Sequence, residues 1–240
     1  MEDTNCLKSE IERLDELNAY ALLDTPRDPY FDRITRLAAC IFEVPVSLIS
    51  FVGADHIWFK SAFGLEHISW TERCPGLCSS AILDDALYVV EDALSDPRTS
   101  GNPLVTGAFG LRFYAAAPLK TAKGSNIGAL SIIDRQPRKF PSSRLSILHL
   151  LADMLMSHIE LSRGMREQRL SSYEATRAMV HDLKNPLTII TLQTELMELE
   201  QQVPPEIREA CSQVNRAGKK MTGIINALLA LMKERPRDNP

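Results

Sequence analysis

Glycine is sparse in this chain. The 240 residues include 11 glycines, dispersed along the sequence. None forms the Gly-x-Gly-x-x-Gly or Walker pattern, whose backbone N–H groups surround nucleotide phosphates. The sequence therefore predicts that this chain does not bind ATP and does not phosphorylate itself.

Basic charge and long apolar runs are also missing. The formal net charge is −4, so no positive field argues for nucleic acid as a partner. The N-terminal residues lack the basic and apolar segments of a secretory signal peptide. No run approaches the roughly 18 apolar residues of a membrane-spanning helix. We expect a cytoplasmic protein without a membrane span.

The cysteines do not describe a disulfide framework, because they are five in number and scattered. Cys74 and Cys78 have three residues between them, a spacing that suits a metal ligand pair or a redox pair. No second ligand pair accompanies them, so no metal site is predicted. A buried structural thiol is the default for Cys78, and a redox response of the Cys74/Cys78 pair is the alternative.

The first 140 residues alternate helical and β-rich patterns. Apolar spacing predicts helices over residues 8–23, 30–42 and 77–83, and strands over 46–52, 56–63, 87–91, 113–120 and 126–134. Residues 64–75 are predicted to be irregular and residues 96–103 to form a loop. This order indicates an α+β domain with an antiparallel sheet.

From Pro141 onward the pattern is helical. We expect one long helix over residues 143–201, a hairpin loop over 201–205 and a second helix over 205–233. The first part of the long helix closes the preceding domain, and its middle forms a parallel coiled-coil linker. Its last part is expected to turn seven residues toward a helical core: Leu183, Leu187, Ile190, Leu192, Thr194, Leu196 and Leu199.

A histidine beside a carboxylate stands near the middle of that long helix. His181 precedes Asp182, and Asn185 follows four residues after the histidine, on the same helical face. A neutral imidazole is a good nucleophile, and an adjacent carboxylate can orient it and accept its proton. Pro186 has no backbone N–H for the Asp182 carbonyl, so the helix can bend there.

The run His181-Asp182-Leu183-Lys184-Asn185-Pro186-Leu187 resembles the phosphoacceptor box of two-component sensor histidine kinases. The resemblance implies a dimerising helical hairpin that forms a four-helix bundle, with His181 as phosphoacceptor. Asp182 would accept the proton, and Asn185 would orient a water or an acceptor group. Lys184 would contact a phosphate or an acidic partner surface, or would be a solvated charge.

Several segments before residue 160 together resemble a bacterial GAF domain. They are residues 22–26, 31–38, 58–61, 96–98, 102–105, 113–119 and 127–134. The resemblance implies a sensory module with helices on one face of an antiparallel sheet and a ligand pocket on the other.

Cys78 and His56 are the candidate residues of that pocket. In bilin-binding relatives the attachment cysteine precedes a histidine, and neither Cys74-Pro75 nor Cys78-Ser79 has that form. Covalent bilin attachment is therefore not expected, and the sensory ligand stays open. Nearby aromatic residues, Trp58, Phe59 and Phe63, are interpreted as core or sheet packing.

We divide the chain into a GAF-type sensory domain (1–160), a helical linker (161–176) and a phosphoacceptor hairpin (177–240). The predicted function is the sensory and phosphoacceptor part of a histidine kinase, which passes phosphate from His181 to a response-regulator aspartate. Its partners would be a second copy, a response regulator and a separate ATP-binding domain; no cofactor is expected in this chain. The alternatives are a stand-alone phosphotransfer adaptor and a ligand-sensing dimerisation module whose histidine is vestigial.

Overall fold

The chain forms two compact units that divide between Arg163 and Gly164. We call them the sheet unit and the hairpin unit. The computed structural model describes residues 2–23, 25, 27–65, 67–73, 77–200 and 204–234. One helix, α5 (Ser142–Leu199), contributes its first part to the sheet unit and the remainder to the hairpin unit.

The sheet unit is built on six antiparallel strands in the order β3-β2-β1-β6-β5-β4. Their bounds are β1 (Val46–Val52), β2 (His56–Phe63), β3 (Trp70–Glu72), β4 (Tyr88–Val90), β5 (Phe113–Lys120) and β6 (Asn126–Asp134). The expected α+β class with an antiparallel sheet is therefore confirmed.

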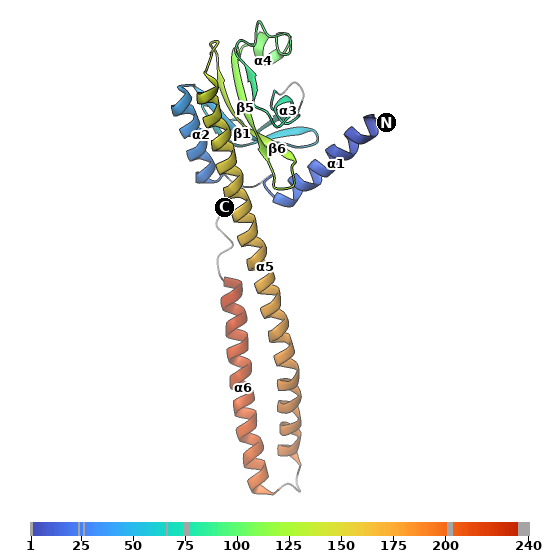
Figure 1. Cartoon of the computed structure of the whole chain (residues 1–240). Coiled ribbons are helices and arrows are strands. Elements are labelled where there is room, and N and C mark those ends of the chain that lie inside the picture. Colours follow the sequence, from blue (N-terminus) through green and yellow to red (C-terminus); the bar gives the residue numbers. More distant parts are fainter. Residues whose placement is uncertain are drawn as a thin grey trace. The chain divides into compact units, whose positions relative to one another are not determined.

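The central strands are covered on both faces. Every residue of β1 and β6 is buried, as are all residues of β5 except Lys120. Helices α1 (Glu2–Tyr20), α2 (Pro29–Phe42) and the first part of α5 pack on one face. The short helices α3 (Cys78–Ala81) and α4 (Pro103–Thr106) lie with their loops over the other face (Figure 1).

Capping residues fix both ends of α2. The Asp28 carboxylate accepts a hydrogen bond from the Tyr30 backbone N–H, and Pro29 occupies the first turn. The helix ends at Glu43, which adopts a left-handed conformation. Arg144, near the start of α5, donates to the Ile41 carbonyl and pairs with the Glu43 carboxylate at 3.0 Å. Arg144 thus ties the end of α2 to the start of α5.

The first and last helices of the sheet unit along the chain, α1 and α5, also contact each other. The Tyr20 hydroxyl, at the end of α1, donates to the Glu160 carboxylate on α5, and Arg163 lies over the Tyr20 ring at 4.7 Å. Burial is the main cause that raises the pKa of Tyr20 far above its ordinary value, followed by the Glu160 carboxylate. Tyr20 therefore remains a neutral hydrogen-bond donor at any physiological pH.

One sequence expectation for the sheet unit was wrong, and another missed a short helix. Residues 64–75 were expected to be irregular, yet they contain β3, which pairs with His56–Trp58 of β2. Its backbone ladder holds this strand, because its side chains do not form a buried apolar face. Residues 96–102 form the expected loop, but its last predicted residue, Pro103, begins the short helix α4, which Asn102 caps and which was not predicted.

The hairpin unit consists of the remainder of α5 and of α6 (Pro205–Glu234). Both helices agree with the predicted ranges, and α5 continues through Pro186. The residues predicted as the centre of the hairpin loop, 201–203, and the C-terminal residues 235–240 lie outside the described part of the chain.

One stretch of α5 is apolar enough to cross a membrane, judged by length and composition alone. An 18-residue window has a mean hydropathy of 1.2, and 33% of it is buried inside the protein. The core helix of a soluble domain passes the same test. The first part of α5 packs into the core of the sheet unit, which supports a core helix rather than a membrane span. The residues that do so are Leu148, Leu151, Leu155 and Ile159.

Candidate functional site

His181 projects into solvent from α5 in the hairpin unit. The side chains of His181 and Asp182 are 73% and 82% exposed, and Nδ1 of the imidazole lies 3.8 Å from Oδ1 of the carboxylate. Consecutive residues on a helix are rotated by roughly 100°, which lets an adjacent carboxylate reach around to the ring. The pair is open to a macromolecular partner and to water.

The other residues of the predicted box lie within one turn of the pair. Asn185 and Pro186 are exposed, and Lys184 is half-buried. The Thr188 hydroxyl donates to the Lys184 carbonyl at 2.8 Å, across the turn that contains Pro186. Sequence reasoning therefore placed Asn185 on the His181 face correctly, and a bend at Pro186 stays a prediction.

Helix α6 holds this part of α5 through polar contacts and close backbone approach. The buried amide of Asn215 hydrogen-bonds to the Thr194 hydroxyl and to the Glu198 carboxylate. A Cβ built on Gly218 would lie 2.7 Å from the Thr191 hydroxyl, so the helices pack too closely there for a larger residue. An ion pair at 3.1 Å between Lys219 and Glu195 adds to the contact.

These contacts show which face of α5 is turned toward α6. Leu187, Thr191 and Thr194 meet α6. At about 100° per residue, His181 and Asn185 lie roughly 110° to 150° around the helix from that contact. The phosphoacceptor candidate therefore faces away from α6.

The predicted core of the hairpin needs correction. Leu187 and Thr194 face α6 as expected. Leu192, Leu196 and Leu199, however, are exposed and fall on the same face as His181. The sequence stripe is wider than the face that one neighbouring helix covers.

Most of the exposed apolar residues in the described part of the hairpin unit fall in two stripes. The histidine-face stripe comprises Ile189, Leu192, Leu196 and Leu199. The side stripe lies on the opposite flank of the contact with α6 and comprises Met179, Leu183, Ile190 and Met197 of α5 with Val214, Met221 and Ile224 of α6. On each helix, the residues of the side stripe are rotated in the same sense away from the face that meets the other helix. Because α5 and α6 are antiparallel, the α5 residues and the α6 residues of this stripe lie on the same side of the hairpin.

In the sheet unit, the two residues predicted to share a ligand pocket lie in different cavities. His56, at the start of β2, lines a wide polar cleft, whereas Cys78 lines a smaller apolar pocket. The prediction of one site with both residues was therefore wrong. Within the described ranges, no three His, Cys, Asp or Glu side chains are grouped so that they could hold a metal ion.

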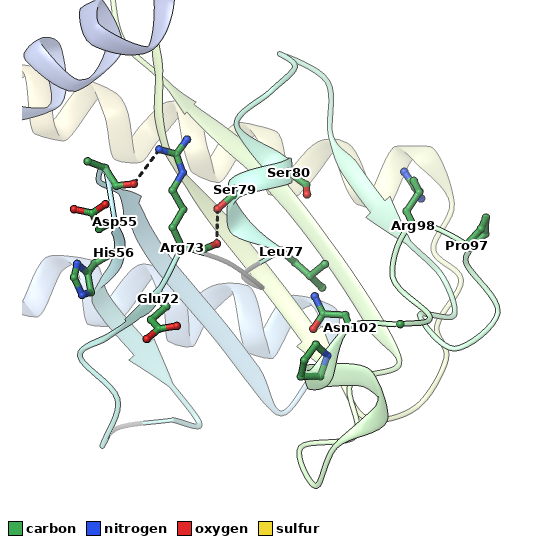
Figure 2. A pocket seen from close by; sticks show the side chains of 13 residues that line it. Asp55, His56, Glu72, Arg73, Leu77, Ser79, Ser80, Pro97, Arg98 and Asn102 are labelled. Carbon is green, nitrogen blue, oxygen red and sulfur yellow. Dashed lines mark hydrogen bonds between the residues drawn. The ribbon is translucent and has the colours of Figure 1, made fainter. Parts of the chain in front are cut away.

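The polar cleft has a volume of about 1000 Å³ and is open to solvent. Figure 2 shows His56, Glu72 and Arg73 on one side and Arg98 and Asn102 on the other. Both guanidinium groups are already engaged: Arg73 pairs with Glu10 at 2.5 Å, and Arg98 pairs with Asp96 at 2.6 Å. The cleft therefore offers less positive charge to an anion than its composition suggests.

The apolar pocket has a volume of about 360 Å³, within the range of small-molecule sites. It lies on the face of the sheet opposite α2 and α5 and is lined by β-strand residues and by residues of α3, α4 and their loops. Leu48, Phe59, Trp70, Cys78, Leu104 and Tyr114 are among its walls.

Cys78 is buried at the wall of the apolar pocket. Its thiol accepts a hydrogen bond from the Tyr114 hydroxyl at 3.4 Å. Burial raises the pKa of the Cys78 thiol, which disfavours the reactive thiolate. This agrees with the expectation of a structural thiol. Cys74 lies outside the described residues, so the redox hypothesis for the Cys74/Cys78 pair stays a prediction.

Sequence reasoning missed two residues that organise these sites. Tyr114 is fully buried, and burial together with Cys78 raises the pKa of its hydroxyl well above the ordinary value. Asn215 is the buried amide between the hairpin helices. A polar residue that interrupts the apolar stripe of a helix is a usable sequence signal for a buried polar contact. Asn215, directly after Val214 of the α6 stripe, is such a residue.

Comparisons with known proteins follow the same division of the chain. Residues 26–159 match the GAF domain family, and residues 172–236 match the His Kinase A (phospho-acceptor) domain. Cyclic di-GMP phosphodiesterase PA2567 of Pseudomonas aeruginosa is 39% identical over 144 residues, which are 60% of this chain and 24% of that protein. The chain thus spans about a quarter of the length of that curated relative.

Solved structures similar to this chain include the GAF domain of an Acinetobacter phosphoenolpyruvate-protein phosphotransferase. It has 16% identity and a TM-score of 0.47, over 67% of this chain and 96% of that one. The second GAF domain of DevS from Mycobacterium smegmatis has 16% identity and a TM-score of 0.45, over 59% of this chain and 99% of that one.

The GAF match alone extends over more than half of the 240 residues, and the phosphoacceptor match contains His181. This chain belongs to the GAF domain family and carries, after its GAF domain, a His kinase A phosphoacceptor domain, a combination that supports histidine kinase-type signalling.

Proposed function

We propose that this chain is the sensory and phosphoacceptor part of a two-component histidine kinase. His181 accepts a phosphoryl group and passes it to an aspartate of a response regulator. The observation that carries the proposal is the exposed His181–Asp182 pair within the phosphoacceptor match. The sheet unit supplies the sensory domain.

The geometry of the pair suggests how His181 is activated. Asp182 lies 3.8 Å from Nδ1, where its carboxylate can accept the proton of that nitrogen while Nε2 acts as the nucleophile. Nε2 attacks the γ-phosphorus of ATP held by a separate catalytic domain, as the bond from phosphorus to the ADP oxygen breaks. Asp182 then takes up the Nδ1 proton, which neutralises the ring of the phosphohistidine.

Asn185 and Lys184 act on the opposite reactant. Asn185 is exposed one turn beyond His181, where its amide orients the attacking carboxylate or a water. Lys184 contributes a positive charge near the transferred phosphoryl group or the acidic surface of the receiver. Pro186 leaves the Asp182 carbonyl without its usual helical donor and permits a bend during transfer.

The histidine-face stripe supports a receiver domain as the partner. Ile189, Leu192 and Leu196 are exposed apolar residues on the same face as His181. Contiguous exposed apolar residues of this kind mark protein-interaction surfaces. We infer that the receiver packs against this stripe while its aspartate approaches Nε2 of His181.

The side stripe supports a homodimer. Family membership implies dimerisation in general, and two antiparallel hairpins that bury their side stripes against each other form a four-helix bundle. A cytoplasmic location follows from the proposed ATP-dependent partners. The sensory ligand acts on the GAF domain.

Labelling with radioactive ATP and the ATP-binding domain of a sensor histidine kinase tests this function. We expect acid-labile, base-stable phosphate on the chain, and its transfer to a receiver domain. His181→Gln abolishes the label, whereas His67→Gln, at an exposed histidine of the sheet unit, retains it. Label that persists in His181→Gln would show that another residue is the acceptor.

A further inference from the structure

The apolar pocket of the sheet unit is distinguished by the chemistry of its walls. Among its described lining residues there is no Lys, Arg, His, Asp or Glu. Four walls are aromatic rings: Phe59, Trp70, Phe109 and Tyr114. A charged ligand placed here would lose its hydration without a counter-charge, which is costly. A neutral ring, by contrast, can stack against aromatic walls.

Tyr114 and Thr71 carry the hydroxyl groups among the lining residues, and Tyr114 is the more deeply buried of the two. The Tyr114 hydroxyl donates to the sulfur of Cys78 at 3.4 Å, and sulfur is a weak acceptor. An oxygen or nitrogen of a bound molecule would be a better partner. The Tyr114 hydroxyl could therefore exchange its weak bond to sulfur for a bond to one polar atom of a ligand.

The mouth of the pocket carries exposed apolar side chains. Ile68, Trp70 and Leu104 line the pocket and are also among the exposed large hydrophobic residues of the sheet unit. The Trp70 ring meets the His56 ring edge-on at 4.7 Å, which holds it at the boundary with the polar cleft. A ligand in the pocket would cover part of this apolar surface and gain hydrophobic free energy.

The volume of about 360 Å³ lies at the lower end of the range for small-molecule sites. One aromatic ring or a fused pair fits this space.

We propose that the apolar pocket binds a neutral aromatic molecule of one or two rings, anchored by a single hydroxyl, carbonyl or N–H group at Tyr114. Nucleotides and other anions are not its ligands. The role of this molecule as the signal rests on the function proposed above, whereas its binding does not.

Fluorescence of Trp70 provides the test. The full chain has two tryptophans, and Trp58→Phe leaves Trp70 as the only one. In this background the probes are indole, p-cresol and acetophenone, with p-toluate as the anionic counterpart of p-cresol. We expect saturable fluorescence changes with at least one neutral probe and none with p-toluate.

Two variants locate the binding. Tyr114→Phe keeps the ring and removes the hydroxyl, and it should weaken the neutral probe about fivefold, the worth of one hydrogen bond. Ser80→Phe, which alters only the polar cleft, should leave binding unchanged. Thermal melting of each variant verifies that it is folded.

Three outcomes would overturn the inference: no saturable binding by any neutral probe up to millimolar concentration, equal binding of p-toluate, or weakening by Ser80→Phe instead of Tyr114→Phe. Labelling of His181 is measured in the same preparations. Loss of labelling with probe binding retained counts against the proposed function alone, and the reverse result counts against the pocket alone.

Discussion

The sheet unit buries most of its large apolar residues within one chain, and the hairpin unit does not. In the sheet unit, β1 and β6 are buried along their whole length between two layers of helices and loops. In the hairpin unit, α5 and α6 cover one face of each other and leave two apolar stripes exposed. The first unit has the packing of a domain that folds alone, whereas the second has the packing of half a core.

This difference assigns the two kinds of partner to different surfaces. A self-contained domain with an internal pocket needs only a small ligand to change its state. A hairpin with two exposed stripes can bind a second copy on one side and a different protein on the other. The exposed residues of the hairpin unit are therefore the places where the comparison can be tested by substitution.

The largest expected effect is the loss of the dimer in Ile190→Glu. Ile190 belongs to the side stripe and is 47% exposed in the single chain, so a charge there would be buried in the four-helix bundle. We expect dimerisation to weaken by about 2 kcal/mol or more, roughly thirtyfold. Light scattering during size-exclusion chromatography over a dilution series measures it.

Ile189→Glu is the matched control for that experiment. Ile189 is the neighbouring residue, is 57% exposed and lies on the histidine-face stripe. This variant should remain a dimer and should lose phosphotransfer to the receiver domain. Equal loss of the dimer in both variants would refute the assignment of the two stripes.

A smaller effect is expected from two glycines of α6. Gly218→Ala brings a methyl group within 2.7 Å of the Thr191 hydroxyl, so we expect destabilisation by about 1 kcal/mol or more. Gly223 has open space where an alanine methyl group would stand, with no atom within 4 Å. Gly223→Ala should therefore stabilise the helix by about 0.5 to 1 kcal/mol. Urea unfolding at fixed protein concentration measures both, and equal signs would contradict the close approach of α6 to α5 at Gly218.

The smallest effect concerns acid stability of the sheet unit. Arg13, followed by Arg73, lowers the pKa of Glu10 from 4.5 to about 2. Because the folded pKa is depressed, this stabilisation is present above about pH 4.5 and is lost as the pH falls toward 2. After allowance for solvent screening, Glu10→Gln should cost about 1 kcal/mol at pH 6 and progressively less below pH 4.5.

Thermal unfolding from pH 6 to pH 3 tests this dependence, with Glu12→Gln at an exposed position of the same helix as the control. The difference between Glu10→Gln and the parent chain should not depend on protein concentration, because the pair lies inside the sheet unit. A difference that grew toward acid pH would show the sign to be wrong.

The parts that sequence predicted well are those encoded by neighbouring residues. The β1, β5 and β6 runs are apolar because both faces are covered, and His181, Asp182 and Asn185 belong to one helical turn and its neighbour. The short strand β3 was missed because its backbone pairing, rather than an apolar face, holds it in the sheet.

Sites built from distant residues could not be predicted in the same way. The apolar pocket combines Leu48, Cys78 and Tyr114, which lie on three separate elements. The separation of the two hairpin stripes depends on which face of α5 meets α6, and no periodicity along one helix contains that information. His56 and Cys78 were assigned to one pocket because no local sequence pattern shows which cavity each residue lines.

The exposure of His181 also bears on what has to move before transfer. The imidazole is 73% exposed and the Asp182 carboxylate 82% exposed, so neither side chain has to leave a packed contact within the hairpin unit before a partner reaches it. In the proposed function, the arrival of the partner, rather than the opening of the hairpin, therefore sets when the phosphoryl group is transferred.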